Sequence, residues 1–111
     1  MECYKTFEAL GDPIRLEIVE RLANQKRLPT LVLVQGVGVS RQAAAKHILV
    51  LERAGVIRSH GEGRQVYREL NPEALTEAQA WIQARTQRWT EKLTKLEEHL
   101  ARIAEAPNSE K

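Results

Sequence analysis

Near the start of the chain, apolar residues recur at helical spacing in two stretches separated by Gly11 and Asp12. Three- and four-residue intervals place such positions on one side of an α-helix. Glycine commonly follows a helix and aspartate caps the start of one, so these two residues predict the end of a first helix and the start of a second. Pro13 then takes the first helical position, where a missing amide hydrogen does no harm. The apolar stripes are Tyr4, Phe7 and Leu10, then Ile14, Ile18 and Leu22.

A further helix is predicted in SRQAAAKHILVLERAGVI, which begins at Ser40, and its two faces differ in chemistry. Ser40 can cap the helix, and Ala44, Ile48 and Leu51 recur at four- and three-residue intervals, so they form a stripe that faces a core. A solvent-exposed helix face usually carries charges of both signs. The outer face of this helix instead begins with two cations, an amide and a small residue: Arg41, Lys46, Gln42 and Ala45.

The segment TLVLVQGVGV, Thr30 to Val39, has two interpretations. Taken alone it is rich in β-branched residues and resembles a strand. Its neighbours favour a short helix over residues 30–35, followed by a turn over residues 36–39 that leads into the Ser40 helix. Two helices joined by a tight turn that contains glycine form a helix-turn-helix unit. We expect the helical form, although local propensity opposes it.

After Gly55 the apolar period changes from helical to two-residue. Residues 56–60 and 65–70 read as strands on either side of GEGR, whose glycines suit a hairpin tip, and such a hairpin forms a β-wing. Asn71 then caps a last helix that Pro72 opens, extending to about Ala104. The predicted fold is therefore mainly α with a small β-hairpin, a winged helix-turn-helix with a long C-terminal dimerisation helix. One domain should span residues 1–105, and residues 106–111 should form a flexible tail.

The last helix carries more apolar surface than a chain of 111 residues can cover by itself. One possibility is that it lies across its own core, but packing against a second copy is the interpretation that we favour. Its apolar positions alternate at four- and three-residue intervals, as in a helix that pairs with another helix. In such a homodimer the first and last helices would meet around the two-fold axis through Tyr4, Phe7, Leu10, Trp81, Trp89, Leu93, Leu96 and Leu100.

The composition indicates the cellular compartment of the protein but says little about the chemistry that it performs. The 42% hydrophobic content suits one small core, and 17 Lys and Arg nearly balance 15 Asp and Glu. The single cysteine, Cys3, rules out an internal disulfide and suits a reducing compartment. No apolar run approaches the ~20 residues of a membrane span, and the N-terminus lacks the pattern of a signal peptide. We therefore expect a cytoplasmic protein without a membrane partner.

Charge is unevenly distributed along the chain. Residues 41–68 contain six basic and two acidic side chains, a net charge of +4, whereas residues from Glu73 onward carry a net charge of −1. A helix start with two cations, an amide and no bulky side chain can enter the major groove of double-stranded DNA. There Arg41 and Gln42 would read base edges, and Lys46 would neutralise phosphate. An ordinary solvated face is the alternative interpretation of these residues.

Three stretches of the chain resemble the ArsR/SmtB family of winged-helix repressors: FEALGDPIRLEIVERLA, VSRQAAAKHILVLERAGVI and GEGRQVYRELNPEAL. Together they cover most of the sequence in the family's order and spacing. The resemblance implies a homodimeric repressor that places the Ser40 helix in the major groove and the hairpin at the minor groove or the backbone. The DNA-binding positions so expected are Ser40, Arg41, Gln42, Ala43, Ala45, Lys46 and His47 on the helix, and Arg58, His60, Arg64 and Gln65 on the wing.

The sequence departs from the family members that sense metals. Many carry a cysteine-containing motif in the third helix, where TLVLVQG has no thiol, imidazole or carboxylate. Others place Asp and His ligands along the last helix, where only His99 stands, next to Glu97 and Glu98. We therefore predict no metal site and no cofactor, and the effector is not identified. The alternative is a metal-responsive repressor with an inter-subunit site that uses Cys3 or His99.

The sequence offers no arrangement of residues typical of an enzyme. It has no glycine-rich phosphate loop and no nucleophile–base pattern, and Cys3 lies at a chain end without an electropositive pocket. The alternative from another class is a protein-interaction module, in which the winged domain docks a protein. Such a face would more often present exposed apolar or aromatic anchors than arginine and lysine.

Overall fold

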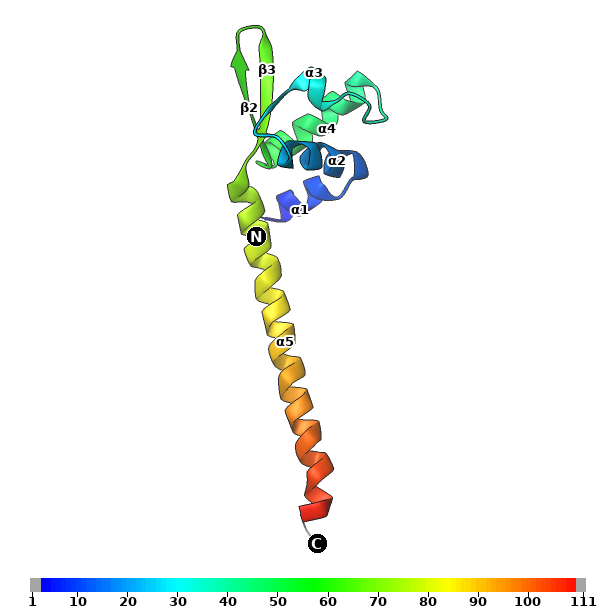
Figure 1. Cartoon of the computed structure of the whole chain (residues 1–111), viewed down its shortest axis with the longest axis vertical. Helices are drawn as coiled ribbons and strands as arrows, with labels where there is room; N and C mark the ends of the chain where they lie inside the picture. The colour runs from blue at the N-terminus through cyan, green and yellow to red at the C-terminus, as the bar shows by residue number, and fades with distance from the viewer. Residues whose placement is uncertain (1–2, 110–111) are drawn as a thin grey trace. The chain divides into compact units, whose positions relative to one another are not determined.

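The computed structural model describes residues 3–109, which divide into two compact units, one up to Ala78 and one from Gln79 onward. The element order confirms the mainly α fold with a hairpin and adds a two-residue strand that the sequence pattern did not predict. The elements are α1 (Tyr4–Leu10), α2 (Pro13–Ala23), β1 (Leu28–Pro29), α3 (Thr30–Leu33), α4 (Arg41–Arg53), β2 (Ile57–Glu62), β3 (Gln65–Leu70) and α5 (Pro72–Ser109) (Figure 1).

The core of the first unit lies where α2, α4 and the start of β2 meet. We expected Val56 to be buried together with Ile18 of α2 and with Ala44, Ile48 and Leu51 of α4. All five residues are at most 2% exposed, which confirms this expectation and the core-facing stripes of both helices. Ala9, Leu22, Leu33 and Ile57 complete the buried cluster. Burying a large aliphatic side chain contributes roughly 1.5–3 kcal/mol, so this cluster fixes how α4 is held against α2.

Helix α3 is a single turn, which confirms the helical interpretation of the β-branched segment but is shorter than predicted. Leu33 is fully buried, and the guanidinium of Arg21 donates hydrogen bonds to the carbonyls of Leu33 and Gln35. This contact from α2 satisfies carbonyl groups at and just beyond the end of the turn. Gly36 and Gly38 then adopt positive φ values of 70° and 89°, a backbone region that favours glycine and turns the chain toward α4.

The three strands form an antiparallel sheet in the order β1-β3-β2. The hairpin pairs Ile57 with Leu70 at its base and Glu62 with Gln65 at its tip, where Gly63 has φ 65°. Strand β2 begins one residue later and ends two residues later than predicted. The added β1 pairs with β3, and the Thr30 hydroxyl donates to the carbonyl of Val66 at 3.0 Å. The wing is therefore tied to the start of α3.

Helix α1 turns its small side chains to the interior. Thr6 and Ala9 are buried, whereas Tyr4 is 54% exposed and Phe7 and Leu10 are half-buried. The face with the largest side chains is thus not the face that α1 packs against its own unit.

Helix α5 begins as predicted, because the Asn71 side-chain oxygen accepts a hydrogen bond from the Glu73 amide at 3.3 Å and Pro72 opens the helix. Its backbone remains helical to Ser109, five residues beyond the predicted end near Ala104. Part of the predicted tail, residues 106–109, therefore continues the helix, and residues 110–111 lie outside the described residues. No helix within residues 3–109 is both long enough and apolar enough to span a membrane.

Asp12 caps α2 as predicted. Its Oδ2 accepts hydrogen bonds from the amides of Arg15 and Ile14, at 3.1 and 2.8 Å. The Arg15 amide is the largest cause of a lowered pKa for this carboxyl, with further lowering from the Ile14 amide and from His47 and Arg15, against the opposing effect of desolvation. The cap therefore favours the ionised carboxylate.

Thermal unfolding should reveal this cap as a loss of stability in acid. A carboxyl with a lowered pKa in the folded state stabilises the fold fully above its unfolded pKa, near 3.8, and loses that contribution as the pH falls through its folded value. Asp12→Asn retains a good capping side chain but cannot titrate. We expect the difference in Tm between wild type and this variant to be constant above about pH 5 and to shrink toward about pH 2. A difference independent of pH would contradict the assignment.

Candidate nucleic-acid interface

The start of α4 presents an exposed polar face because its opposite face is fixed in the core. The Ser40 side chain accepts a hydrogen bond from the Ala43 amide at 3.1 Å, which confirms the predicted cap. With Ala44, Ile48 and Leu51 buried, the side of the helix opposite them must face outward. The outward residues of the first turns are the predicted ones: Arg41, Gln42, Ala45 and Lys46, all exposed. Leu49, 41% exposed, continues this face one turn later and was missed.

The six basic residues between positions 41 and 68 fall into two groups in the structure, those with a side-chain partner and those without one. Arg68 is held by the Ser59 and Thr30 hydroxyls, at 2.6 and 3.0 Å, and lies 3.6 Å from Glu52. Arg58 lies 4.0 Å from Glu69 across the hairpin. Within the described part of the chain, the other four basic residues have no side-chain hydrogen bond or ion pair: Arg41, Lys46, Arg53 and Arg64. All four are exposed, so the positive charge available to a partner lies on α4 and at the hairpin tip.

One side of the hairpin is fixed by Arg27, which precedes β1 and which the sequence analysis did not single out. Its guanidinium lies 2.7 Å from Glu62 Oε2, 2.8 Å from His60 Nε2 and 4.3 Å from the centre of the Tyr67 ring. The hydrogen bond between Arg27 and Glu62 raises the pKa of the arginine and lowers the pKa of the carboxyl. His60 is therefore engaged by a neighbouring cation, whereas Arg64 and Gln65 at the tip remain exposed.

His47 lies between α4 and α2 rather than on the exposed face of α4. Its Nδ1 is 3.2 Å from the guanidinium of Arg15 and 3.8 Å from the Asp12 carboxylate, and the residue is half-buried. Arg15 also donates hydrogen bonds to the carbonyls of Glu8 and Ala9 near the end of α1. This position favours a structural role for His47, which the resemblance placed among the DNA-binding residues.

Helix α3 lies between the start of α4 and the wing. Leu31 borders one hollow with Gln35 and Arg41, and a second hollow with Arg64 and Val66. Leu31 is 62% exposed, although its spacing alone gave no sign of which side it would face. Because Leu31 borders both hollows, Arg41 at the start of α4 and Arg64 at the wing tip lie on either side of the same short helix.

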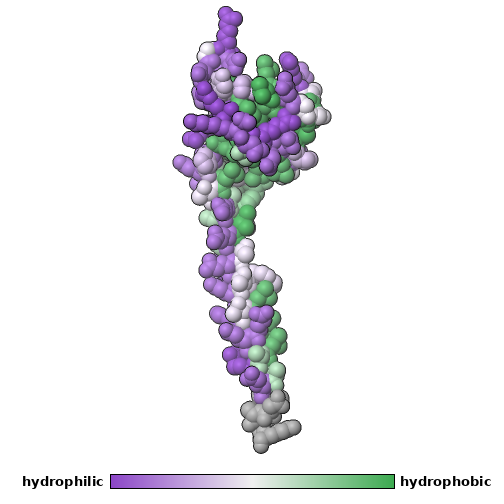
Figure 2. All heavy atoms as spheres, viewed as in Figure 1, coloured by the Kyte–Doolittle hydropathy of each residue, from purple (hydrophilic) through white to green (hydrophobic). Residues whose placement is uncertain are grey.

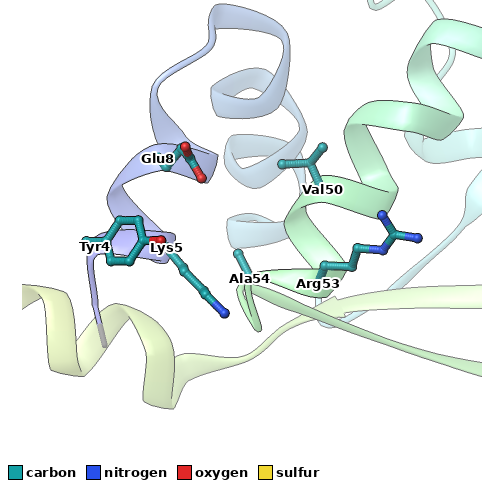
Figure 3. A pocket seen from close by; sticks show the side chains of 6 residues that line it. All are labelled: Tyr4, Lys5, Glu8, Val50, Arg53 and Ala54. Carbon is teal, nitrogen blue, oxygen red and sulfur yellow. The ribbon is translucent and has the colours of Figure 1, made fainter. Parts of the chain in front are cut away.

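A separate hollow of about 230 Å³ lies between α1 and the end of α4 (Figure 3). Tyr4, Lys5 and Glu8 line it from α1, and Val50 and Arg53 line it from α4. It combines one acid, two bases and an aromatic ring, without a buried polar group. A partner that covers Tyr4 at this place would also touch the helix that carries the candidate DNA contacts.

The part of the chain that the structure describes contains no preformed cluster of metal ligands. Within residues 3–109, no three side chains of His, Cys, Asp or Glu lie close enough together to hold a metal ion. Cys3 is buried and His99 is exposed. An inter-subunit site, which needs a second copy, is a different arrangement from any within one chain.

The geometry of the first unit defines the class of protein. A one-turn helix, a glycine-containing turn and an exposed basic helix are followed by a hairpin with a basic tip, and together they form a winged helix-turn-helix. A family described as a helix-turn-helix domain matches residues 10–60. The chain is similar to an uncharacterized HTH-type transcriptional regulator, YuzN of Bacillus subtilis, with 33% identity over 84 residues that cover 69% of this chain and 91% of the relative.

Solved structures agree with this class. An ArsR-like transcriptional regulator from Rhodococcus sp. RHA1 has 27% identity and a TM-score of 0.76, covering 87% of this chain and 91% of that one. A homodimeric winged helix-turn-helix domain, Mb0332 from Mycobacterium bovis, shares the fold at 20% identity and a TM-score of 0.62, covering 82% of this chain and 83% of that one. The chain belongs to the ArsR family of helix-turn-helix transcriptional regulators, which confirms the resemblance found in the sequence.

Proposed function

We propose that the protein is a homodimeric repressor that binds an inverted-repeat operator in double-stranded DNA. One observation carries the proposal: Arg41 and Lys46 on α4 and Arg64 at the hairpin tip are exposed cations without an acidic partner among the described residues. An unpaired exposed cation can neutralise a phosphate without first losing an ion pair of its own. This property separates these residues from Arg58 and Arg68.

The residues of the region divide into reading and holding roles. The first turn of α4 reaches base edges in the major groove, so Arg41 and Gln42 read sequence, while the small side chains of Ala43 and Ala45 allow close approach. Ser40 offers its own hydroxyl at the helix start. Lys46 on α4 and the exposed tip residues Arg64 and Gln65 hold the DNA backbone. Arg58 and His60 along β2 would first have to leave Glu69 and Arg27 to do the same.

The dimer follows from the exposed apolar surface outside the DNA-binding region. Tyr4 on α1 and Trp89, Leu93, Leu96 and Leu100 on α5 are each at least 40% exposed. The structural relative from Mycobacterium bovis is a homodimer, which supports the same assembly here. Two α4 helices related by a two-fold axis would read half-sites about 10 base pairs apart, or a multiple of that distance.

Selection of bound sequences from a pool of random duplexes tests this function. The expected result is an inverted repeat with that half-site spacing, which a gel shift should then confirm at salt concentrations where random DNA is released. Recovery of no common sequence, or of a single half-site, would contradict a two-fold symmetric reader.

Loss of the holding residues should weaken all DNA equally. Lys46→Ala and Arg64→Ala should reduce affinity for the operator and for a scrambled duplex by similar factors. Each phosphate contact removed should also flatten the slope of log affinity against log salt by about 0.9. Titrations at four or more salt concentrations measure both quantities. Lys95→Ala, which removes an exposed cation of α5, is the matched control and should leave the slope unchanged.

A further inference from the structure

The hairpin extends beyond the core of the first unit, and only one of its strands is paired with a strand outside it. In the sheet order β1-β3-β2, β3 lies between the other two strands and β2 forms an outer edge. Residues 61–66 are all exposed, and Figure 2 shows hydrophilic residues over the projecting end of the hairpin. Because an isolated two-stranded hairpin is at best marginally stable in water, polar contacts have to hold this end in place.

Strand β3 is connected to the rest of the first unit through Arg68. The guanidinium of Arg68 contacts the hydroxyls of Thr30 and Ser59 at 3.0 and 2.6 Å, and it lies 3.6 Å from Glu52 on α4. The Thr30 hydroxyl also donates to the carbonyl of Val66. These contacts join β3 to α3 and α4, but β2 takes part in them only through Ser59.

Arg27 binds the opposite face of the hairpin and reaches the outer strand. His60 and Glu62 stand two residues apart on β2, and Tyr67 is the register partner of His60, so these three side chains share one face. The Arg27 guanidinium lies 4.3 Å from the centre of the Tyr67 ring. Its Nη1 is 2.8 Å from His60 Nε2 and 2.7 Å from Glu62 Oε2. Within residues 3–109, no other side chain from outside the hairpin forms a hydrogen bond or ion pair with β2.

Both ends of this contact are well defined. Arg27 directly precedes β1, whose two residues pair with Arg68 and Tyr67 of β3, so its backbone is fixed beside the hairpin. The hydrogen bond with Glu62 raises the pKa of the arginine and lowers the pKa of the carboxyl, so both groups stay charged near neutral pH. The contact therefore joins the start of β1 to the end of β2.

We propose that Arg27 is a positioning residue for DNA binding, which holds β2 so that Arg64 at the hairpin tip meets the DNA backbone. The proposal rests on the proposed function, in which Arg64 contacts phosphate. Glu62 is the last residue of β2 and stands two residues before Arg64, so a displacement of this strand end displaces the tip. Arg27 acts through Arg64, because its own guanidinium would have to leave three partners to reach DNA.

A double-mutant cycle on DNA affinity tests this dependence. Arg64→Ala removes one phosphate contact per wing, which is worth roughly fivefold in affinity at 0.15 M salt relative to 1 M salt. Arg27→Ala should weaken binding by up to the same factor, on operator and scrambled duplex alike, and should flatten the salt slope. In an Arg64→Ala background, Arg27→Ala should have almost no further effect, because the contact that it positions is already absent.

Removal of the acid distinguishes positioning from direct contact. Glu62→Ala eliminates a negative charge near the tip and frees Arg27, so binding should become stronger if Arg27 itself contacts phosphate. Positioning predicts the opposite result, weaker binding, because β2 loses its connection to Arg27. Lys26→Ala removes the adjacent exposed cation, and Tyr67→Phe retains the ring. Both are matched controls and should leave the affinity and the salt slope unchanged.

Nuclear magnetic resonance relaxation of the full chain gives a readout that does not involve DNA. The order parameter of the Arg64 backbone amide should fall in Arg27→Ala toward the range of a flexible backbone, below about 0.6. The same amide should keep its wild-type value in Lys26→Ala. Circular dichroism of each variant should show an unchanged helix content, since the buried core contains none of these residues.

Additive effects of Arg27→Ala and Arg64→Ala on affinity and salt slope would overturn the proposal, because Arg27 would then be a phosphate contact of its own. It would also fail if Arg27→Ala left the Arg64 order parameter or the affinity unchanged while Arg64→Ala weakened binding. That outcome would leave the proposed function intact. An Arg64→Ala variant that binds DNA like the wild type would instead contradict the wing contact on which both proposals rest.

Discussion

Replacement of Trp89 by alanine should weaken the homodimer by about 3–5 kcal/mol, the range for truncating a buried tryptophan or phenylalanine. The indole is 63% exposed in the single chain, so its burial depends on the second copy. Large aromatic side chains supply much of the burial in an interface, and the symmetric dimer contains this side chain twice. Sedimentation equilibrium over a range of concentrations should show the dissociation constant rising roughly a hundredfold or more.

Gln87→Ala is the matched control, because this residue stands on the same helix away from the apolar positions Trp89, Leu93, Leu96 and Leu100 and should leave the dissociation constant unchanged. Circular dichroism should show that both variants keep their winged heads folded, since the core of the first unit contains neither residue. Wild-type protein that sediments as a monomer at micromolar concentration would refute the dimer. A dimer indifferent to Trp89→Ala would move its interface away from the distal half of α5.

Local signals in the sequence predicted most of the fold. Asp12, Ser40 and Asn71 were each identified as caps from residue type and position, and each accepts the backbone hydrogen bond expected of it. A helix cap joins a side chain to a backbone amide two or three positions later, so a short stretch of sequence contains both partners. The buried stripes of α2 and α4 were predictable for the same reason, because helical periodicity is local.

Contacts between distant segments were not predictable in this way. Arg68 contributes to the positive charge of residues 41–68, but its guanidinium donates a hydrogen bond to the hydroxyl of Thr30, 38 residues away. The sequence gives no sign of this contact. The role of Arg27 could not be predicted from local sequence, because its partners on the wing, His60 and Glu62, lie 33 residues or more further along the chain. Side chains of the same type therefore have different roles, and the tertiary fold decides which cations remain available for DNA.

The length of α3 shows a different limit. β-branched residues favour a strand, and the segment forms one helical turn because Leu33 enters the core and Arg21 binds the carbonyls at its end. Both causes are tertiary, so propensity alone gave neither the helix nor its end. The exposed apolar residues of α5 are the opposite case. Their spacing was evident from the sequence, but their partner is not part of the single chain.

Substitution of the reading residues should remove specificity more than affinity for DNA in general. Arg41→Ala or Gln42→Ala should each cost about 1–3 kcal/mol on the operator and little on a scrambled duplex. Both residues are exposed in the first turn of α4, where side chains reach base edges, and neither is tied to another side chain within the described residues. A base contact is lost only on the sequence that supplies the matching base, whereas a phosphate contact is lost on every sequence.

Titration of each variant against operator and scrambled duplex at several salt concentrations separates these two kinds of contact. The ratio of operator to scrambled affinity should fall for Arg41→Ala and Gln42→Ala but stay near its wild-type value for Arg64→Ala. The salt slope should change for Arg64→Ala and remain nearly constant for Gln42→Ala, since an uncharged amide displaces no counterion. If Arg41→Ala and Arg64→Ala behaved alike on both duplexes, the division between reading and holding would be wrong. If neither variant changed binding, α4 and the wing tip would not form the DNA-binding surface. Arg41 is an exposed cation of α4, and Arg64 is the exposed cation of the hairpin tip.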